Sequence, residues 1–131
     1  MAEKQKTVLI VEDSPAQALA LGHSLEQAGL RVLWARDGQI GVNMAQEHLP
    51  DVILLDVEMP KMNGFEACQL LKENAQTADI PVIMLTVHTE PITVNALLEQ
   101  GAIEFIPKGA FSEAVLIETL RQLDILPATE S

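Results

Sequence analysis

The chain has 131 residues, of which 48% are hydrophobic and 21% are charged, a composition that predicts one compact folded domain and excludes a disordered or low-complexity chain. Nineteen acidic residues against eight basic ones give a formal net charge of −11, so the surface would repel nucleic acid and anionic membranes, and direct DNA binding is not expected. Scattered acidic residues also keep a protein in solution, so only carboxylates gathered at one place would indicate a site.

Short apolar segments recur along the chain and predict five β-strands. In chain order these segments are Thr7–Val11, Arg31–Ala35, Val52–Leu55, Pro81–Leu85 and Ile103–Ile106. The stretches between and after them have apolar residues at helical spacing. Examples are Ala18, Leu21 and Leu25 early in the chain, and Val115, Leu116, Leu120 and Leu123 late in it.

The first helix has the clearest predicted boundaries. Ser14 is a typical N-cap residue, Pro15 suits the first helical position, and Gln17 completes a capping box. The helix should end near Gly29, because glycine commonly follows the last turn of a helix.

The strand segments do not alternate polar and apolar residues, so both faces of the sheet should be covered by helices. Strand then helix, five times, with right-handed crossovers, predicts an α/β fold. Few topologies satisfy that handedness, and we expect the commonest of them, a (βα)5 doubly wound parallel five-stranded sheet with strand order 2-1-3-4-5, flavodoxin-like. Ligands of such sheets bind beyond the carboxyl ends of the strands.

Polar residues follow four of the predicted strands and should meet at that edge of the sheet. They are Glu12 and Asp13 after the first strand, Asp56 after the third, Thr86 after the fourth and Lys108 after the fifth. Each alone has an ordinary explanation, such as a helix cap. Three carboxylates held together repel one another, however, unless a cation lies between them or their pKa values are raised. All-oxygen ligands suit Mg²⁺, for which Mn²⁺ could substitute, and Asp13 and Asp56 would be its direct carboxylate ligands.

At these positions the chain resembles the receiver domains of two-component response regulators. The resemblance lies in the strings Val11-Glu12-Asp13-Ser14, Leu55-Asp56-Val57-Glu58-Met59-Pro60, Asn63-Gly64-Phe65-Glu66, Leu85-Thr86 and Phe105-Ile106-Pro107-Lys108. It covers about residues 5 to 124, in the right order, and implies a single receiver domain over residues 1–131 with a short flexible C-terminal tail.

The resemblance implies a role for each residue of the site. Asp56 would accept the phosphoryl group. Asp13, Asp56 and the backbone carbonyl of Glu58 would bind the metal, with Glu12 acting through a metal-bound water. Thr86 and Lys108 would contact phosphoryl oxygens, and Thr86 and Phe105 would form the switch that alters the surface of the fourth helix, fifth strand and fifth helix.

The same resemblance implies a phosphorylation-dependent signalling switch rather than an enzyme. Its phosphoryl donor would be a sensor histidine kinase or a phosphotransfer protein, and its target another protein that the sequence does not identify. The only reactions it would catalyse are its own phosphorylation and a slow autodephosphorylation. Phosphorylation could also drive dimer formation.

Two positions depart from the family pattern. The family lysine is usually followed by proline across a cis peptide, but here the order is Pro107-Lys108-Gly109, so a cis bond in this loop would have to be Ile106–Pro107. Val87 stands where a small residue is usual. Its branched side chain should narrow the site, and we expect slower phosphorylation by small donors and slower hydrolysis.

Several conspicuous side chains are given no role in the chemistry. His23 and His48 should lie on outer helix surfaces, and His88 should lie near the entrance of the site, where it would tune the pH dependence. A second group, Trp34, Met44, Met59, Met62 and Met84, is expected to serve packing.

Three alternatives remain open at this point. A phosphatase of the haloacid-dehalogenase type also uses a strand-terminal aspartate, but its motif needs a second aspartate and normally follows the first strand. A flavodoxin-like electron carrier would need a phosphate loop and aromatic residues, which make up only 3% here. A degenerate receiver would act only as a protein-binding scaffold.

The single cysteine and the polar N-terminus bear on location. Cys68 cannot form an internal disulfide, and the apolar run Val8–Val11 is too short for a signal peptide or a membrane span. We therefore expect a cytoplasmic protein.

Overall fold

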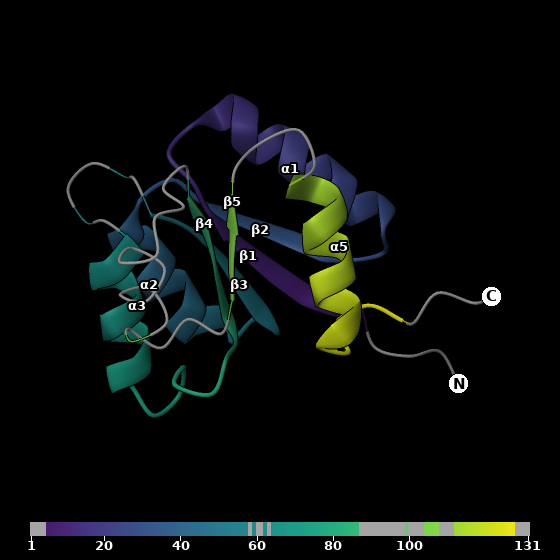
Figure 1. Ribbon diagram of the computed structural model, residues 1–131. Helices are drawn as coiled ribbons and strands as arrows, with labels where there is room; N and C mark the ends of the chain where they lie inside the picture. Colours follow the sequence, from purple (N-terminus) through teal and green to yellow (C-terminus); the bar gives the residue numbers. More distant parts are fainter. Residues whose placement is uncertain are drawn as a thin grey trace.

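The protein is represented by a computed structural model that describes residues 5–57, 59, 62, 64–86, 99, 104–107 and 112–127. Of Glu104, Phe105 and Ser112 only the backbone is described. The strands are β1 (Thr7–Val11), β2 (Arg31–Ala35), β3 (Val52–Asp56), β4 (Val82–Thr86) and β5 (Glu104–Pro107). The helices are α1 (Pro15–Gln27), α2 (Gly38–His48), α3 (Gly64–Glu73) and α5 (Ser112–Gln122), as drawn in Figure 1.

The five strands form one parallel sheet in the order β2-β1-β3-β4-β5, which confirms the predicted topology. The strand predicted over residues 81–85 begins one residue later, at Val82. Pro81 has no N–H to donate, and its carbonyl accepts a bond from the Ile53 amide (3.0 Å) just before the strand starts. The last strand, predicted to end at Ile106, extends one residue further to Pro107. Its predicted first residue, Ile103, lies outside the described residues.

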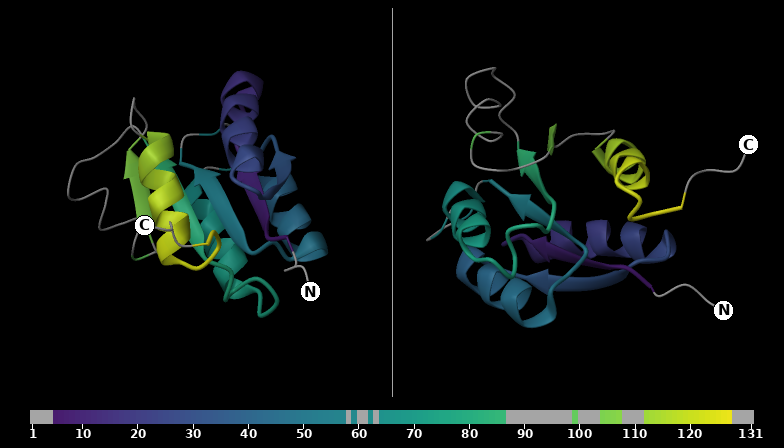
Figure 2. Two further views of the ribbon diagram at one scale, coloured as in Figure 1. Left: turned by 90° about the vertical axis from the view of Figure 1, so that its right-hand side faces the viewer. Right: turned by 90° about the horizontal axis from the view of Figure 1, so that it is seen from below.

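Helices cover both faces of the sheet (Figure 2). On one face α2 and α3 pack over a core cluster that includes Leu9, Leu55 and Met84, and on the other α1 and α5 pack over a cluster that includes Ile10 and Leu54. All five residues of β3 and all five of β4 are buried. Their continuous apolar sequences are therefore explained by cover on two sides.

The helix boundaries follow the local chemistry of the chain. Ser14 caps α1, since its hydroxyl accepts a bond from the Gln17 amide at 3.3 Å. Gly29 lies just beyond that helix with a φ of 104°, a conformation that favours glycine. Asp37 caps α2 by accepting a bond from the Ile40 amide at 2.8 Å.

The amino ends of β1 and β3 are joined by a reciprocal pair of hydrogen bonds. The Thr7 amide donates to a carboxylate oxygen of Asp51 (2.7 Å), and the Asp51 amide donates to the Thr7 carbonyl (2.8 Å). A carboxylate makes stronger hydrogen bonds than a neutral acceptor. This pair therefore holds the amino ends of the two central strands together.

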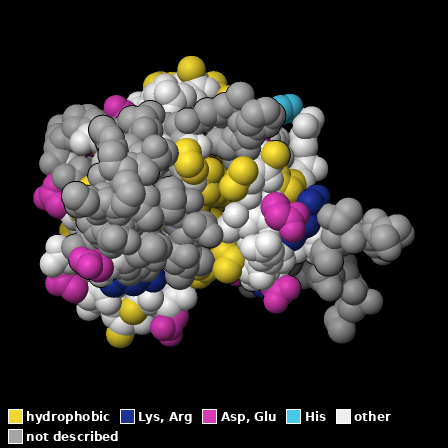
Figure 3. All heavy atoms as spheres, viewed as in Figure 1, with side chains coloured by type: hydrophobic (Ala, Val, Ile, Leu, Met, Phe, Trp, Pro, Cys, Tyr) yellow, Lys and Arg dark blue, Asp and Glu magenta, His cyan; other side chains and the backbone are white. Residues whose placement is uncertain are grey.

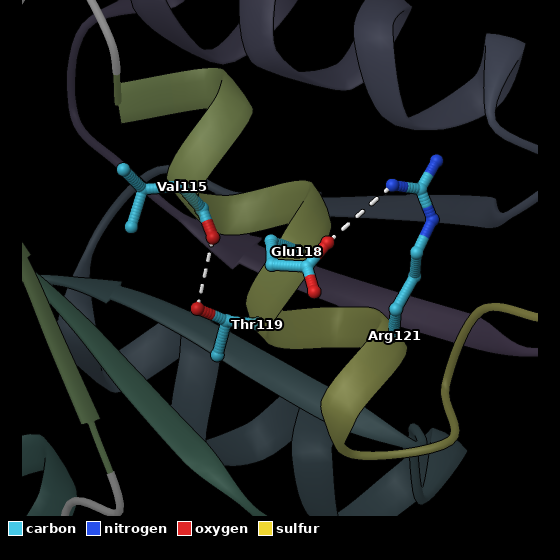
Figure 4. Close-up of polar contacts among 4 residues, drawn as sticks. All are labelled: Val115, Glu118, Thr119 and Arg121. Atoms are coloured by element: carbon cyan, nitrogen blue, oxygen red, sulfur yellow. Dashed lines mark hydrogen bonds and ion pairs between the residues drawn. The ribbon is translucent and has the colours of Figure 1, made fainter. Parts of the chain in front are cut away.

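Only part of the apolar pattern predicted for α5 faces the core. Leu116 and Leu120 are fully buried, whereas Val115 is 46% exposed and lies beside the buried stripe of the helix. Figure 4 shows the outer side of this helix, where the Thr119 hydroxyl donates to the Val115 carbonyl (2.9 Å) and Arg121 lies 3.6 Å from Glu118. Such exposed pairs contribute little to stability.

Candidate functional site

Three carboxylates meet at the carboxyl ends of β1 and β3, as the sequence predicted. Glu12, Asp13 and Asp56 each offer an oxygen, and these oxygens lie within 4.8 Å of one another. We call these three residues the acidic cluster. Among the described residues visible in Figure 3, acidic side chains are scattered over the surface rather than gathered into one patch.

The strand register explains why these residues meet. Val11 pairs with Leu55 in the parallel ladder between β1 and β3, so the residues that follow each of them emerge at the same edge. Glu12 and Asp56 are 3% and 2% exposed, whereas Asp13 is exposed. The cluster therefore has two buried carboxylates and one that faces solvent.

The backbone of Glu12 is held by the neighbouring strand β2. Its amide donates to the Ala35 carbonyl (3.0 Å), and its carbonyl accepts a bond from the indole N–H of Trp34 (2.8 Å). Trp34 was predicted to serve packing, but it is 41% exposed and makes this polar contact. The prediction missed the contact because nothing in the local sequence indicates what an edge-strand tryptophan will touch.

The end of β3 is held by its neighbouring strand β4 and by the close approach of α3. The Val57 amide donates to the Leu85 carbonyl, and the Gly64 amide donates to the Val57 carbonyl, each at 3.0 Å. A Cβ atom on Gly64 would lie 2.8 Å from the Asp56 carbonyl oxygen and 2.8 Å from the Val57 Cα. Only glycine fits here without a shift of the backbone that carries Asp56.

Thr86 is the last residue of β4 and is fully buried. It follows Leu85, which pairs with Asp56, so it ends its strand at the same edge of the sheet as the acidic cluster. It also pairs with Pro107, the residue that precedes Lys108 in the sequence.

Other predicted site residues lie outside the described part of the chain. These are Glu58, Lys108, Val87 and His88, together with the side chain of Phe105. Their roles stay predictions. No peptide bond among the described residues is cis, and this includes Ile106–Pro107.

The residues given no chemical role are placed largely as expected. His23 and His48 are exposed on α1 and α2, and His48 lies 3.9 Å from Glu47. Met59 and Met84 are buried in the core cluster, and Met44 and Met62 pack against it.

The acidic cluster fits a hard divalent cation. Three negative charges at this spacing repel one another, and burial of two of them reduces the screening that water provides. Oxygen ligands from one or two carboxylates, with an open solvent-facing side, are what Mg²⁺ binds in proteins. The donor set is therefore of the right kind for that ion.

Comparison with known proteins identifies the family. Residues 8–121 match the response regulator receiver domain. Over 109 residues the chain is 38% identical to protein PilH of Pseudomonas aeruginosa, covering 83% of this chain and 90% of PilH. Several other curated relatives are longer, and the chain spans between 8% and 51% of their length.

Solved structures agree with the sequence match. The chemotaxis protein CheY4 of Vibrio cholerae superposes with a TM-score of 0.85 at 34% identity, covering 91% of this chain and 98% of CheY4. The receiver domain of the Pseudomonas aeruginosa sensor histidine kinase PA1611, which has a magnesium ion coordinated in its active-site cleft, gives a TM-score of 0.82 at 26% identity, covering 91% of this chain and 97% of that domain.

The chain belongs to the response regulator receiver domain family and is a phosphorylation-dependent signalling switch of two-component systems. This membership removes the haloacid-dehalogenase phosphatase and the flavodoxin-like electron carrier as alternatives. Within the described residues, no helix has the length and apolar character needed to cross a membrane.

Proposed function

We propose that Asp56 is the phosphoacceptor of this receiver. A carboxylate oxygen of Asp56 attacks the phosphorus of a phosphohistidine on a sensor histidine kinase or phosphotransfer protein. The new O–P bond forms as the P–N bond breaks, and the imidazole leaves with its electron pair. The observation that carries this proposal is the meeting of Asp56 with Glu12 and Asp13 at the carboxyl edge of the sheet.

The proposed cofactor is Mg²⁺, with Mn²⁺ as a substitute. Asp13, Asp56 and the backbone carbonyl of Glu58 would hold the ion, and Glu12 would contact it through a water. When bound, the ion supplies the positive charge that offsets the phosphoryl oxygens. Support comes from the three converging carboxylates and from the magnesium-bound receiver of PA1611.

Thr86 and Lys108 would contact the transferred phosphoryl group, and the movement of Thr86 would start the change of conformation. The Thr86 hydroxyl would donate to one phosphoryl oxygen and the Lys108 ammonium would pair with another. Movement of Thr86 toward the phosphoryl group would free space for Phe105, which changes the surface formed by the predicted fourth helix, β5 and α5. The burial of Thr86 at the end of β4 supports this, because the residue ends its strand at the same edge of the sheet as Asp56.

The receiver would form one domain over residues 1–131, with its core at about residues 5–124. Its switching partner would be a separate downstream protein, and phosphorylation could also drive a dimer. The chain would catalyse only its own phosphorylation and slow autodephosphorylation. The single cysteine, Cys68, cannot form an internal disulfide, and on that ground we place the protein in the cytoplasm.

The test is intact-mass analysis after incubation with acetyl phosphate and Mg²⁺. Wild type should gain one phosphoryl group, and Asp56→Asn should gain none, because the amide is not a nucleophile for phosphorus. Asp124→Asn is the matched control, since Asp124 is exposed and has a φ of 61° that asparagine tolerates. A parallel arm with a phosphorylated histidine kinase covers slow reaction with the small donor.

Two results would contradict the proposal. Phosphorylation of Asp56→Asn would show that another residue is the phosphoacceptor. A wild-type chain that gains no phosphoryl group from either donor would instead be a degenerate receiver that acts as a scaffold.

A further inference from the structure

Trp34 lies beside the acidic cluster without belonging to it. It pairs with Ile10 in the ladder between β2 and β1, and that ladder ends one residue further on, at Val11 and Ala35. The indole N–H reaches beyond this last pair and donates to the Glu12 carbonyl at 2.8 Å. A side chain thus extends the contact between the two strands past the point where their ladder stops.

This hydrogen bond acts on the peptide group that carries Asp13. The Glu12 carbonyl and the Asp13 amide belong to one planar unit, so fixing the carbonyl also fixes the Cα of Asp13. The preceding peptide group is fixed as well, because the Glu12 amide donates to the Ala35 carbonyl at 3.0 Å. With the peptide groups on both sides held, Glu12 has little freedom to rotate about its φ and ψ angles.

Asp13 depends on this support more than its neighbours in the cluster. Glu12 and Asp56 are buried and are held by the packing around them, whereas Asp13 is exposed. Repulsion from the other two carboxylates, whose oxygens lie within 4.8 Å, would drive Asp13 toward solvent. A fixed backbone limits that movement and keeps its carboxylate where a cation can bind.

We propose that Trp34 is a positioning residue of the metal site, which it preorganises through the hydrogen bond from its indole N–H to the Glu12 carbonyl. This inference rests on the proposed function, since it assumes that the acidic cluster binds Mg²⁺. It differs from a packing role, for which the ring alone would suffice and the N–H would be irrelevant.

The test compares Mg²⁺ binding by wild type and Trp34→Phe, using isothermal titration calorimetry. Phenylalanine keeps an aromatic ring on the strand and removes the donor. Loss of one hydrogen bond that preorganises the site should weaken Mg²⁺ binding about two- to tenfold. A second chain carries 3-benzothienylalanine at position 34, which keeps the bicyclic shape and replaces the N–H by sulfur, and it should weaken binding to the same extent.

A control separates positioning from a general loss of fold. Val115→Ala removes an exposed apolar side chain on α5 and should bind Mg²⁺ as wild type does. Urea unfolding in EDTA then shows whether each chain is folded before the metal is added.

Each outcome distinguishes the two proposals. Weaker binding by both position-34 chains, with wild-type binding by Val115→Ala, supports the positioning role. Equal Mg²⁺ affinity for wild type and both position-34 chains overturns it and leaves the proposed function standing. A wild-type chain that binds no Mg²⁺ overturns the metal site and the positioning role together.

Discussion

The ends of β1 and β3 bring carboxylates to the same cluster, but they are supported by different means. At β1, Glu12 is held from the edge strand by two hydrogen bonds, one of them from the Trp34 side chain. At β3, the backbone after Asp56 is held by one hydrogen bond to β4 and by α3, which approaches so closely that Gly64 cannot carry a Cβ atom without a shift of the backbone. The support at β1 includes the indole N–H of Trp34, which a substitution can remove. The support at β3 requires that Gly64 has no Cβ atom.

We expect the contact between α3 and the end of β3 to be the more sensitive of the two to substitution. Gly64→Ala should lower the free energy of unfolding by about 2–3 kcal/mol, because the atoms that the new methyl group meets belong to the backbone and cannot rotate away. Urea unfolding in EDTA measures this effect without any contribution from metal.

Gly22 on α1 provides the matched control for that substitution. Its Cβ would lie 3.4 Å from the nearest atom, a side-chain carbon of Val32. Gly22→Ala should therefore raise the free energy of unfolding by up to about 1 kcal/mol, as expected for glycine replaced within a helix. An equal decrease in the free energy of unfolding in the two variants would show that α3 is no closer to the sheet than α1.

A smaller effect should follow from changing the charge of the cluster while leaving both supports intact. Asp13→Asn should bind Mg²⁺ at least about tenfold more weakly, because a carboxylate ligand becomes a neutral amide. Under saturating conditions for wild type, the stabilisation by Mg²⁺ should then fall by about 1.4 kcal/mol.

In EDTA the same variant should be more stable than wild type, since one of three repelling charges is gone. Thermal unfolding with and without Mg²⁺ measures both effects, with Asp124→Asn as the control. If Mg²⁺ raised the unfolding temperature of Asp13→Asn as much as that of wild type, Asp13 would not be a ligand of the cation.

The smallest expected effect is a change in the reactivity of Cys68. This thiol is fully buried on α3, one turn after Gly64, and burial raises its pKa while Lys72 acts in the opposite direction. Because the side chain has no exposed surface, and the raised pKa leaves less thiolate at a given pH, a thiol reagent at pH 8 should label the native chain only when α3 opens.

Labelling of Cys68 therefore reports on the support at β3. Gly64→Ala should be labelled faster than wild type, and Gly22→Ala should not. Immediate labelling of the folded wild type would contradict the tight packing of α3.

The fold could be predicted from the sequence because the apolar segments are short, continuous and separated by well-marked turns. The same reasoning brought together Glu12, Asp13 and Asp56, since parallel strands end at one edge of a sheet. It did not find the contact made by Trp34 or the close approach at Gly64, because both depend on distances between elements far apart in the chain. Asn63-Gly64 indicates only a joint, and nothing in it shows what the following helix will touch.

The pair of hydrogen bonds between Thr7 and Asp51 places part of the protein's rigidity at the end of the sheet remote from the acidic cluster. This contact and the acidic cluster lie at opposite ends of the same two strands. Loss of the Asp51 carboxylate should therefore loosen the pairing of β1 with β3 without removing any group from the acidic cluster.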